Sequence, residues 1–157
     1  MNWQEVCEHP SLRNLPFKIE LNQYGQIVMS PVKVYHSAFQ GRIGSLLDRL
    51  LTGYVLAECA IATHKGTKVA DVAWVSPDRF EIVREEDECS IAPEICVEVI
   101  SSSNSEREIR EKMALYFGQG ALECWICNET GNMSFHNREG RLEHSALAPD
   151  FPSRIDL

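Results

Sequence analysis

The sequence has no long apolar run. None of its hydrophobic stretches approaches the ~20 residues needed to span a bilayer, and its first fifteen residues, MNWQEVCEHPSLRNL, have neither the basic start nor the apolar stretch of a secretory leader. We therefore expect a cytoplasmic protein that does not interact with membranes. No repeat, low-complexity tract or linker interrupts the 157 residues, so a single domain covering residues 1–157 is expected.

Basic residues are also scarce. The chain has 15 lysines and arginines against 23 acidic residues, which gives a formal net charge of −8. This balance argues against a passive nucleic-acid coat, because such a protein needs a basic surface. It does not exclude an enzyme that binds a cation between carboxylates, since that site is negative until the metal arrives.

A cysteine framework is not expected either. The six cysteines are scattered along a chain of 157 residues that we expect to be cytoplasmic, so they do not suggest disulfides. Cys124 and Cys127 form a CxxC, but no second CxxC completes a four-cysteine zinc site. The surrounding ALECWICN resembles a buried strand, in which residues three apart point to opposite faces. We interpret the thiols as small buried apolar groups.

The apolar pattern predicts the order of the elements. Helical spacing is seen at 34–51 and at 105–120, where Ser105 and Glu108 match a capping box. Strands are expected at 54–63, 68–76, 94–101 and 121–128, a short helix within 77–88, and hairpins at 16–31 and 132–147. This predicts an α+β (mixed α/β) fold with a helix–three strands–helix–strand core and extra terminal β-hairpins.

Two acids break the apolar pattern of their strands. Asp71 lies in VADVAWV and Glu98 lies in ICVEVI, each flanked on both sides by apolar residues. A buried carboxylate without a partner costs several kcal/mol. Each acid therefore needs a salt bridge, backbone donors or a cation.

Lys112 is out of place in a complementary way. It occupies the apolar stripe of its helix, which is formed by Ile109, Lys112, Met113 and Tyr116. The strand runs about 10 Å beyond Glu98 before it ends, and Lys112 lies about 10 Å along the helix from its start. If the helix folds back across the sheet, Lys112 faces Glu98.

Glu58 is a second-tier candidate. If His64–Thr67 forms the turn between the first two strands, Ala60 pairs with Asp71, and Glu58 becomes a diagonal neighbour of Asp71 on the same face. A register slip of one residue would remove it.

These residues allow two interpretations. One is structural: an ion pair between Glu98 and Lys112, with Asp71 held by backbone donors. The other is a two-carboxylate site for Mg²⁺, with Mn²⁺ as an alternative, because Mg²⁺ prefers oxygen ligands and keeps several waters. A metal-bound hydroxide and a neighbouring lysine suit phosphodiester hydrolysis.

The strings VADVAWVS and APEICVEVISSSNSEREIREKMALYFGQGALECWICN resemble the Uma2 family (domain of unknown function 820), which is common in cyanobacteria. That family belongs to the PD-(D/E)XK, or restriction endonuclease-like, superfamily. The resemblance implies a metal-dependent endonuclease that hydrolyses phosphodiester bonds in DNA, with Asp71 and Glu98 as metal ligands and Lys112 as the catalytic lysine. The wider superfamily usually places the lysine two residues after the glutamate, where this chain has Ile100.

Alternatives stay open. The chain could be a catalytically inactive nuclease-fold protein with a binding or regulatory role, or a phosphoesterase that acts on RNA or small substrates. A homodimer is expected from base rates. His36, on the inner side of its helix, is either a satisfied histidine or a catalytic one. Candidate phosphate contacts are Lys65, Lys68, Arg107 and Arg110.

Overall fold

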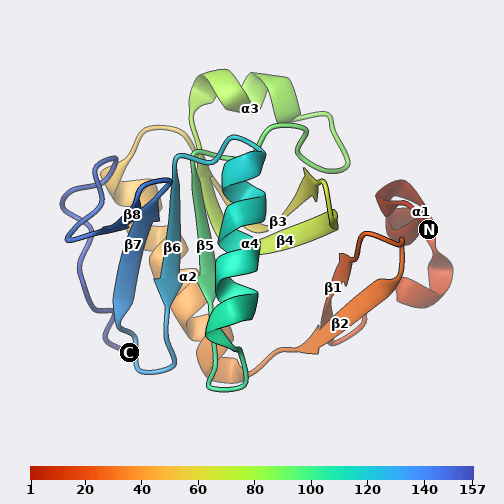
Figure 1. The fold of residues 1–157 in the computed structure, drawn as a ribbon, viewed down its shortest axis with the longest axis horizontal. Coiled ribbons are helices and arrows are strands. Elements are labelled where there is room, and N and C mark those ends of the chain that lie inside the picture. Colours follow the sequence, from red (N-terminus) through yellow and green to blue (C-terminus); the bar gives the residue numbers. More distant parts are fainter.

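A six-stranded sheet with helices on both faces forms the centre of the protein (Figure 1). The computed structural model describes all residues from 1 to 157. The elements in chain order are α1 (Trp3–Glu8), a 3₁₀ turn (Pro10–Leu12), β1 (Phe17–Leu21), β2 (Ile27–Pro31), α2 (Val34–Leu50), β3 (Tyr54–Thr63), β4 (Gly66–Val75), α3 (Pro77–Val83), β5 (Ile95–Val99), α4 (Glu106–Gly118), β6 (Glu123–Cys127), β7 (Met133–Asn137) and β8 (Gly140–Leu142). The expected α+β fold and its core order are confirmed.

The strands follow one another across the sheet in the order β3-β4-β5-β6-β7-β8. Only β5 and β6 run parallel, and α4 makes the crossover between them. Helix α4 begins as predicted: the Ser105 side chain accepts a hydrogen bond from the Glu108 N–H at 3.1 Å. The crossover lays α4 across the face of the sheet that carries Glu98 (Figure 1).

Each face of the sheet has its own core. Helix α2 packs Phe39, Ile43 and Leu47 against one face, where Val97 and Trp125 are buried. Helix α4 covers the other face, and α3 lies at one end of the strands (Figure 1). The core on this side includes Tyr116, Val83, Cys96 and Cys124. None of the helices is both long and apolar enough to cross a bilayer.

The CxxC cysteines lie on opposite faces of the sheet, as the strand interpretation predicted. Cys124 belongs to the core under α4, and Cys127 belongs to the core under α2. All six cysteines are free thiols. The two side chains therefore cannot bind one zinc ion.

A separate two-stranded sheet, β1–β2, lies beside the central sheet and packs on β4 (Figure 1). The approach is close at Gly66, which has a φ of +89°, because a Cβ there would clash with the carbonyl oxygens of Leu21 and Asn22. Lys68 Nζ donates to the Leu21 carbonyl at 3.2 Å. The predicted N-terminal hairpin is therefore a wall that faces β4.

The structure corrects three details of the sequence prediction. The β3–β4 turn contains only two residues, because Thr63 pairs with Gly66; Ala60 therefore pairs with Val69, and the predicted pairing with Asp71 is wrong by two residues. Helix α1 was not predicted. The C-terminal hairpin is shorter than predicted, since β8 ends at Leu142 and residues 143–157 continue without a named strand.

Candidate active site

Asp71 and Glu98 lie next to each other on adjacent strands. Val72 of β4 pairs with Val97 of β5, so the next opposed pair in the antiparallel register is Asp71 and Glu98. Their side chains are only 2% and 10% exposed. Asp71 Oδ2 accepts the Val99 N–H at 2.8 Å, so the carboxylate replaces a backbone acceptor at this point of the sheet.

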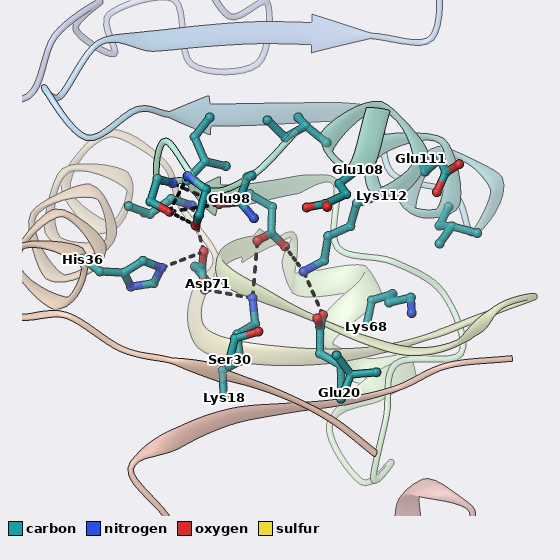
Figure 2. A pocket seen from close by; sticks show the side chains of 18 of the residues that line it. Lys18, Glu20, Ser30, His36, Lys68, Asp71, Glu98, Glu108, Glu111 and Lys112 are labelled. Atoms are coloured by element: carbon teal, nitrogen blue, oxygen red, sulfur yellow. Dashed lines mark hydrogen bonds and ion pairs between the residues drawn. The ribbon is translucent and has the colours of Figure 1, made fainter. Parts of the chain in front are cut away.

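The ammonium group of Lys18 lies between the two carboxylates. Its Nζ is 3.0 Å from Asp71 Oδ1 and 3.3 Å from Glu98 Oε2. Dashed lines mark both contacts in Figure 2. Burial opposes the charged form of Lys18, but the neighbouring carboxylates outweigh it and raise the pKa of the ammonium above its ordinary value. Lys18 comes from β1, so the outer hairpin supplies a charge to the central site.

Lys112 lies on the other side of Glu98, as predicted. Its Nζ is 3.2 Å from Glu98 Oε1 and 2.8 Å from Oε2 of Glu20 on β1. The hydroxyl of Tyr116, one helical turn further along α4, donates to Glu98 Oε1 at 2.6 Å. Helix α4 thus contributes two groups that hold the same carboxylate oxygen.

Acids and lysines alternate through the site. In Figure 2 the chain of ion pairs passes from Asp71 to Lys18, Glu98, Lys112 and Glu20. The Glu20 carboxylate also accepts the Val69 N–H at 2.6 Å, which joins it to β4. Burial opposes ionisation of Glu20, but the two lysines outweigh it and lower its pKa. Each acid in this chain of ion pairs therefore has a lysine as its counter-charge.

His36 lies at the outer end of the chain of ion pairs. Its Nε2 is 3.3 Å from Asp71 Oδ2, and this hydrogen bond raises the pKa of the imidazole against the opposing effect of burial. Its Nδ1 is buried and has no hydrogen-bond partner. His36 therefore contacts a site carboxylate directly, which a histidine satisfied elsewhere in the core would not do.

The two central acids have opposite pKa shifts. Burial would raise the pKa of Asp71, but its bonds to His36 and Lys18 outweigh burial and lower it well below the ordinary range. Burial raises the pKa of Glu98, against the opposing effect of both lysines. Asp71 is therefore the more firmly ionised of the two.

The acids lie in a cavity of about 660 Å³ between the β1–β2 hairpin, the sheet and α4. Lys65 and Lys68 line it, so two of the four candidate phosphate contacts face the site. Arg107 and Arg110 are exposed on α4 and do not line it; Arg107 pairs with Glu111 at 3.1 Å. The local surroundings of the acids are thus richer in lysine than the net charge suggests.

Glu58 is not joined to the other site residues. It lies opposite Asp71 in the β3–β4 register, but the two are not paired, and Glu58 has a φ of 50° at this unpaired position within β3. It is exposed and lines the cavity, yet no hydrogen bond or ion pair connects it to Asp71. The structure brings together Asp71, Glu98 and Lys112, but not Glu58.

The donor set fits a divalent cation with oxygen ligands. No group of three or more His, Cys, Asp or Glu side chains is arranged to hold a metal ion. However, Asp71 Oδ1 and Glu98 Oε2 converge on one point, at which the Lys18 ammonium now stands in for a cation. Mg²⁺ is commonly bound by one or two carboxylates together with waters and substrate oxygens, so these two residues would be sufficient.

Comparison with known proteins identifies the family and the fold. The model of the Uma2 family, described as "Putative restriction endonuclease", matches residues 3–152. The chain belongs to the Uma2 family. A solved structure from Anabaena variabilis, titled "putative nuclease belonging to DUF820", is similar over 98% of this Uma2 chain and 94% of its own, with a TM-score of 0.74 and 16% identity. At that identity the likeness shows the fold. No curated protein matches.

Sequence reasoning missed Lys18 and Glu20. Both lie in FKIEL, where charged and apolar residues alternate and place the two charges on one face of β1. The same alternation is typical of a strand whose polar face meets water. Only the position of the hairpin against β4 turns that face of this Uma2 protein into a wall of the site.

Replacing Tyr116 with phenylalanine is expected to lower the free energy of unfolding by about 1.5–3 kcal/mol. The change removes a hydrogen bond to a charged group in a buried place, at 2.6 Å from Glu98. Urea unfolding followed by circular dichroism measures it. Tyr24→Phe is the control, because Tyr24 is 76% exposed. Equal stability of the two variants would mean that the hydroxyl does not hold Glu98.

Proposed function

We propose that this Uma2 protein is a Mg²⁺-dependent endonuclease that hydrolyses phosphodiester bonds in DNA. The observation that carries the proposal is the convergence of two buried carboxylates and one inward-facing lysine on a single cavity. A structural ion pair needs one acid and one base, whereas here two acids direct oxygens to the same point. Family membership supports a nuclease as the class of enzyme.

The roles follow from the contacts. Asp71 and Glu98 would hold the cation, which supplies a hydroxide at neutral pH and shields the phosphoryl oxygens when bound. Val99 and His36 fix the orientation of Asp71, and Tyr116 fixes that of Glu98. Such supporting bonds keep the ligand oxygens in place.

Lys112 is the proposed catalytic lysine. Its ammonium is anchored between Glu98 and Glu20 and lines the cavity, so it is ready to stabilise negative charge that develops on a phosphate. It comes from α4 and not from β5, the strand that carries Glu98. The position two residues after Glu98, where the wider superfamily usually has its lysine, is Ile100, directly after β5.

DNA is the proposed substrate, and a symmetric homodimer in the cytoplasm is the proposed working form. Lys33, Lys65 and Lys68 line the cavity and supply positive charge for phosphates on an otherwise acidic protein. A pair of subunits related by two-fold symmetry could cut both strands of a duplex. RNA or a small phosphoester remains the alternative substrate.

The test is cleavage of supercoiled plasmid DNA with Mg²⁺ and with EDTA. Lys112→Ala is expected to cleave at least about a hundredfold more slowly, which is the usual effect of losing one charge-stabilising donor. Arg84→Ala removes the same charge from the exposed end of α3 and is expected to cleave like the wild type. Equal cleavage by the wild type and Lys112→Ala would reveal a contaminating nuclease and remove the proposal.

One observation favours a second candidate, a nuclease fold that binds without catalysis. The Lys18 ammonium already contacts both carboxylates at the point where a cation would bind. Calorimetry separates the two functions, because a purely binding protein is expected to take up neither Mg²⁺ nor Mn²⁺ at millimolar concentration.

A further inference from the structure

Lys18 holds the two carboxylate oxygens that a metal would need. We propose that its ammonium is a displaceable internal cation, and that a divalent cation binds Asp71 and Glu98 only when this ammonium leaves. The inference rests on the proposed metal-dependent function and adds a control step to the same site. Lys18 is thus a gate on metal binding and not a catalytic residue.

The bonding of the carboxylates makes this competition direct. Asp71 Oδ2 is taken by the Val99 N–H and by His36, and Glu98 Oε1 is taken by Tyr116 and Lys112. The remaining oxygens, Asp71 Oδ1 and Glu98 Oε2, are the two that Lys18 contacts. A metal ion and an ammonium cannot occupy the same point between them.

The net charge of the site also favours replacement of the Lys18 ammonium by a divalent cation over binding of the cation beside it. Three carboxylates and two ammonium groups form the chain of ion pairs, which leaves one excess negative charge beside His36. A divalent cation that replaced the Lys18 ammonium would leave the acids and Lys112 neutral in sum. A divalent cation added beside Lys18 would place two positive groups in contact in a poorly hydrated site, which is strongly unfavourable.

The position of Lys18 allows its ammonium to move away from Asp71 and Glu98. It is carried by β1 of the separate hairpin, whereas Lys112 is fixed on α4 against the central sheet. Its flexible four-carbon stem borders the cavity of about 660 Å³. Glu20 lies on the same face of β1 and can receive a displaced ammonium. Lys18 can therefore withdraw without unfolding the sheet that holds the acids.

The first test is Mn²⁺ titration by calorimetry of the wild type, Lys18→Met and Arg84→Met. Methionine keeps the apolar stem and removes the charge, so Lys18→Met is expected to bind Mn²⁺ at least about tenfold more tightly, because the competing state is gone. Arg84→Met removes an equal charge from the exposed end of α3, outside the cavity, and is expected to match the wild type.

The outcomes separate the two proposals. If the wild type binds Mn²⁺ and Lys18→Met binds it no more tightly, the gate is wrong and the metal-dependent function stands. If neither protein binds Mn²⁺, both are wrong. If Arg84→Met tightens binding as much as Lys18→Met, the effect is general electrostatics and the gate is wrong.

A second test uses the wild type and does not depend on how well a variant folds. Lysines are acylated with an N-hydroxysuccinimide acetate in EDTA and in saturating Mn²⁺, and mass spectrometry reads the modification of each peptide. The Lys18 side chain is 10% exposed and ion-paired, so it is expected to be protected in EDTA and to react several-fold faster with Mn²⁺. Lys65 is expected to react equally in both. Continued protection of Lys18 in saturating Mn²⁺ would overturn the inference.

Discussion

Asp71→Asn is expected to lower Mg²⁺-dependent DNA cleavage by at least about a thousandfold, which corresponds to several kcal/mol of lost metal assistance. Asparagine has the shape of aspartate and can still accept the Val99 N–H, so the fold of β4 and β5 should persist. The loss then reflects the missing negative charge at the oxygen that faces Lys18.

The measurement is the single-turnover rate of plasmid cleavage, with Mn²⁺ affinity from calorimetry beside it. Asp48→Asn is the matched control, because it removes the same charge from an exposed residue near the C-terminal end of α2. Cleavage by Asp71→Asn within tenfold of the wild type would show that Asp71 is a structural residue and would remove the two-carboxylate site.

Glu123→Ala is expected to lower the free energy of unfolding by about 4 kcal/mol, because it leaves several buried donors without an acceptor. Glu123 is only 2% exposed. Its carboxylate accepts hydrogen bonds from Trp125 Nε1 at 2.8 Å, from Ser145 Oγ at 2.6 Å, and from the N–H groups of Ala146 and Leu147 at 3.0 Å each. These bonds fix the C-terminal segment against the start of β6.

Urea unfolding of the wild type and Glu123→Ala measures this loss. Glu129→Ala is the control, since Glu129 is exposed in the loop after β6 and its removal should leave stability nearly unchanged. The rate of DNA cleavage per folded molecule should stay at the wild-type value, because Glu123 does not line the cavity. A loss below about 1 kcal/mol would mean that the segment stays in place without the carboxylate.

Acids at apolar positions in the sequence indicated the candidate site, but this pattern did not predict all of the residues that form it. Asp71, Glu98 and Lys112 were predicted from charges in apolar positions, and the structure brings them together. Glu123 gives the same pattern at the start of an apolar strand, yet its partners are hydroxyl, indole and backbone donors. What distinguishes a site acid is a neighbouring charge from another part of the chain, and no local pattern records this.

The outer hairpin was the part that local patterns could least predict. Its strands were expected, but the approach of β1 to β4 depends on a two-residue turn at His64–Lys65 and on the missing Cβ of Gly66. Interpreting His64–Thr67 as a longer turn moved the register by two residues and hid this approach. Lys18 and Glu20 were missed for the same reason.

The alternating acids and lysines affect how the protein folds in the absence of a metal ion. In many small metal-binding domains the chain stays unfolded until the metal neutralises its ligands. Here each acid of the chain of ion pairs already has a lysine partner within the same molecule. A newly made chain is therefore expected to reach its final shape in the presence of a chelator, and under the proposed function the ion would be needed for cleavage and not for folding.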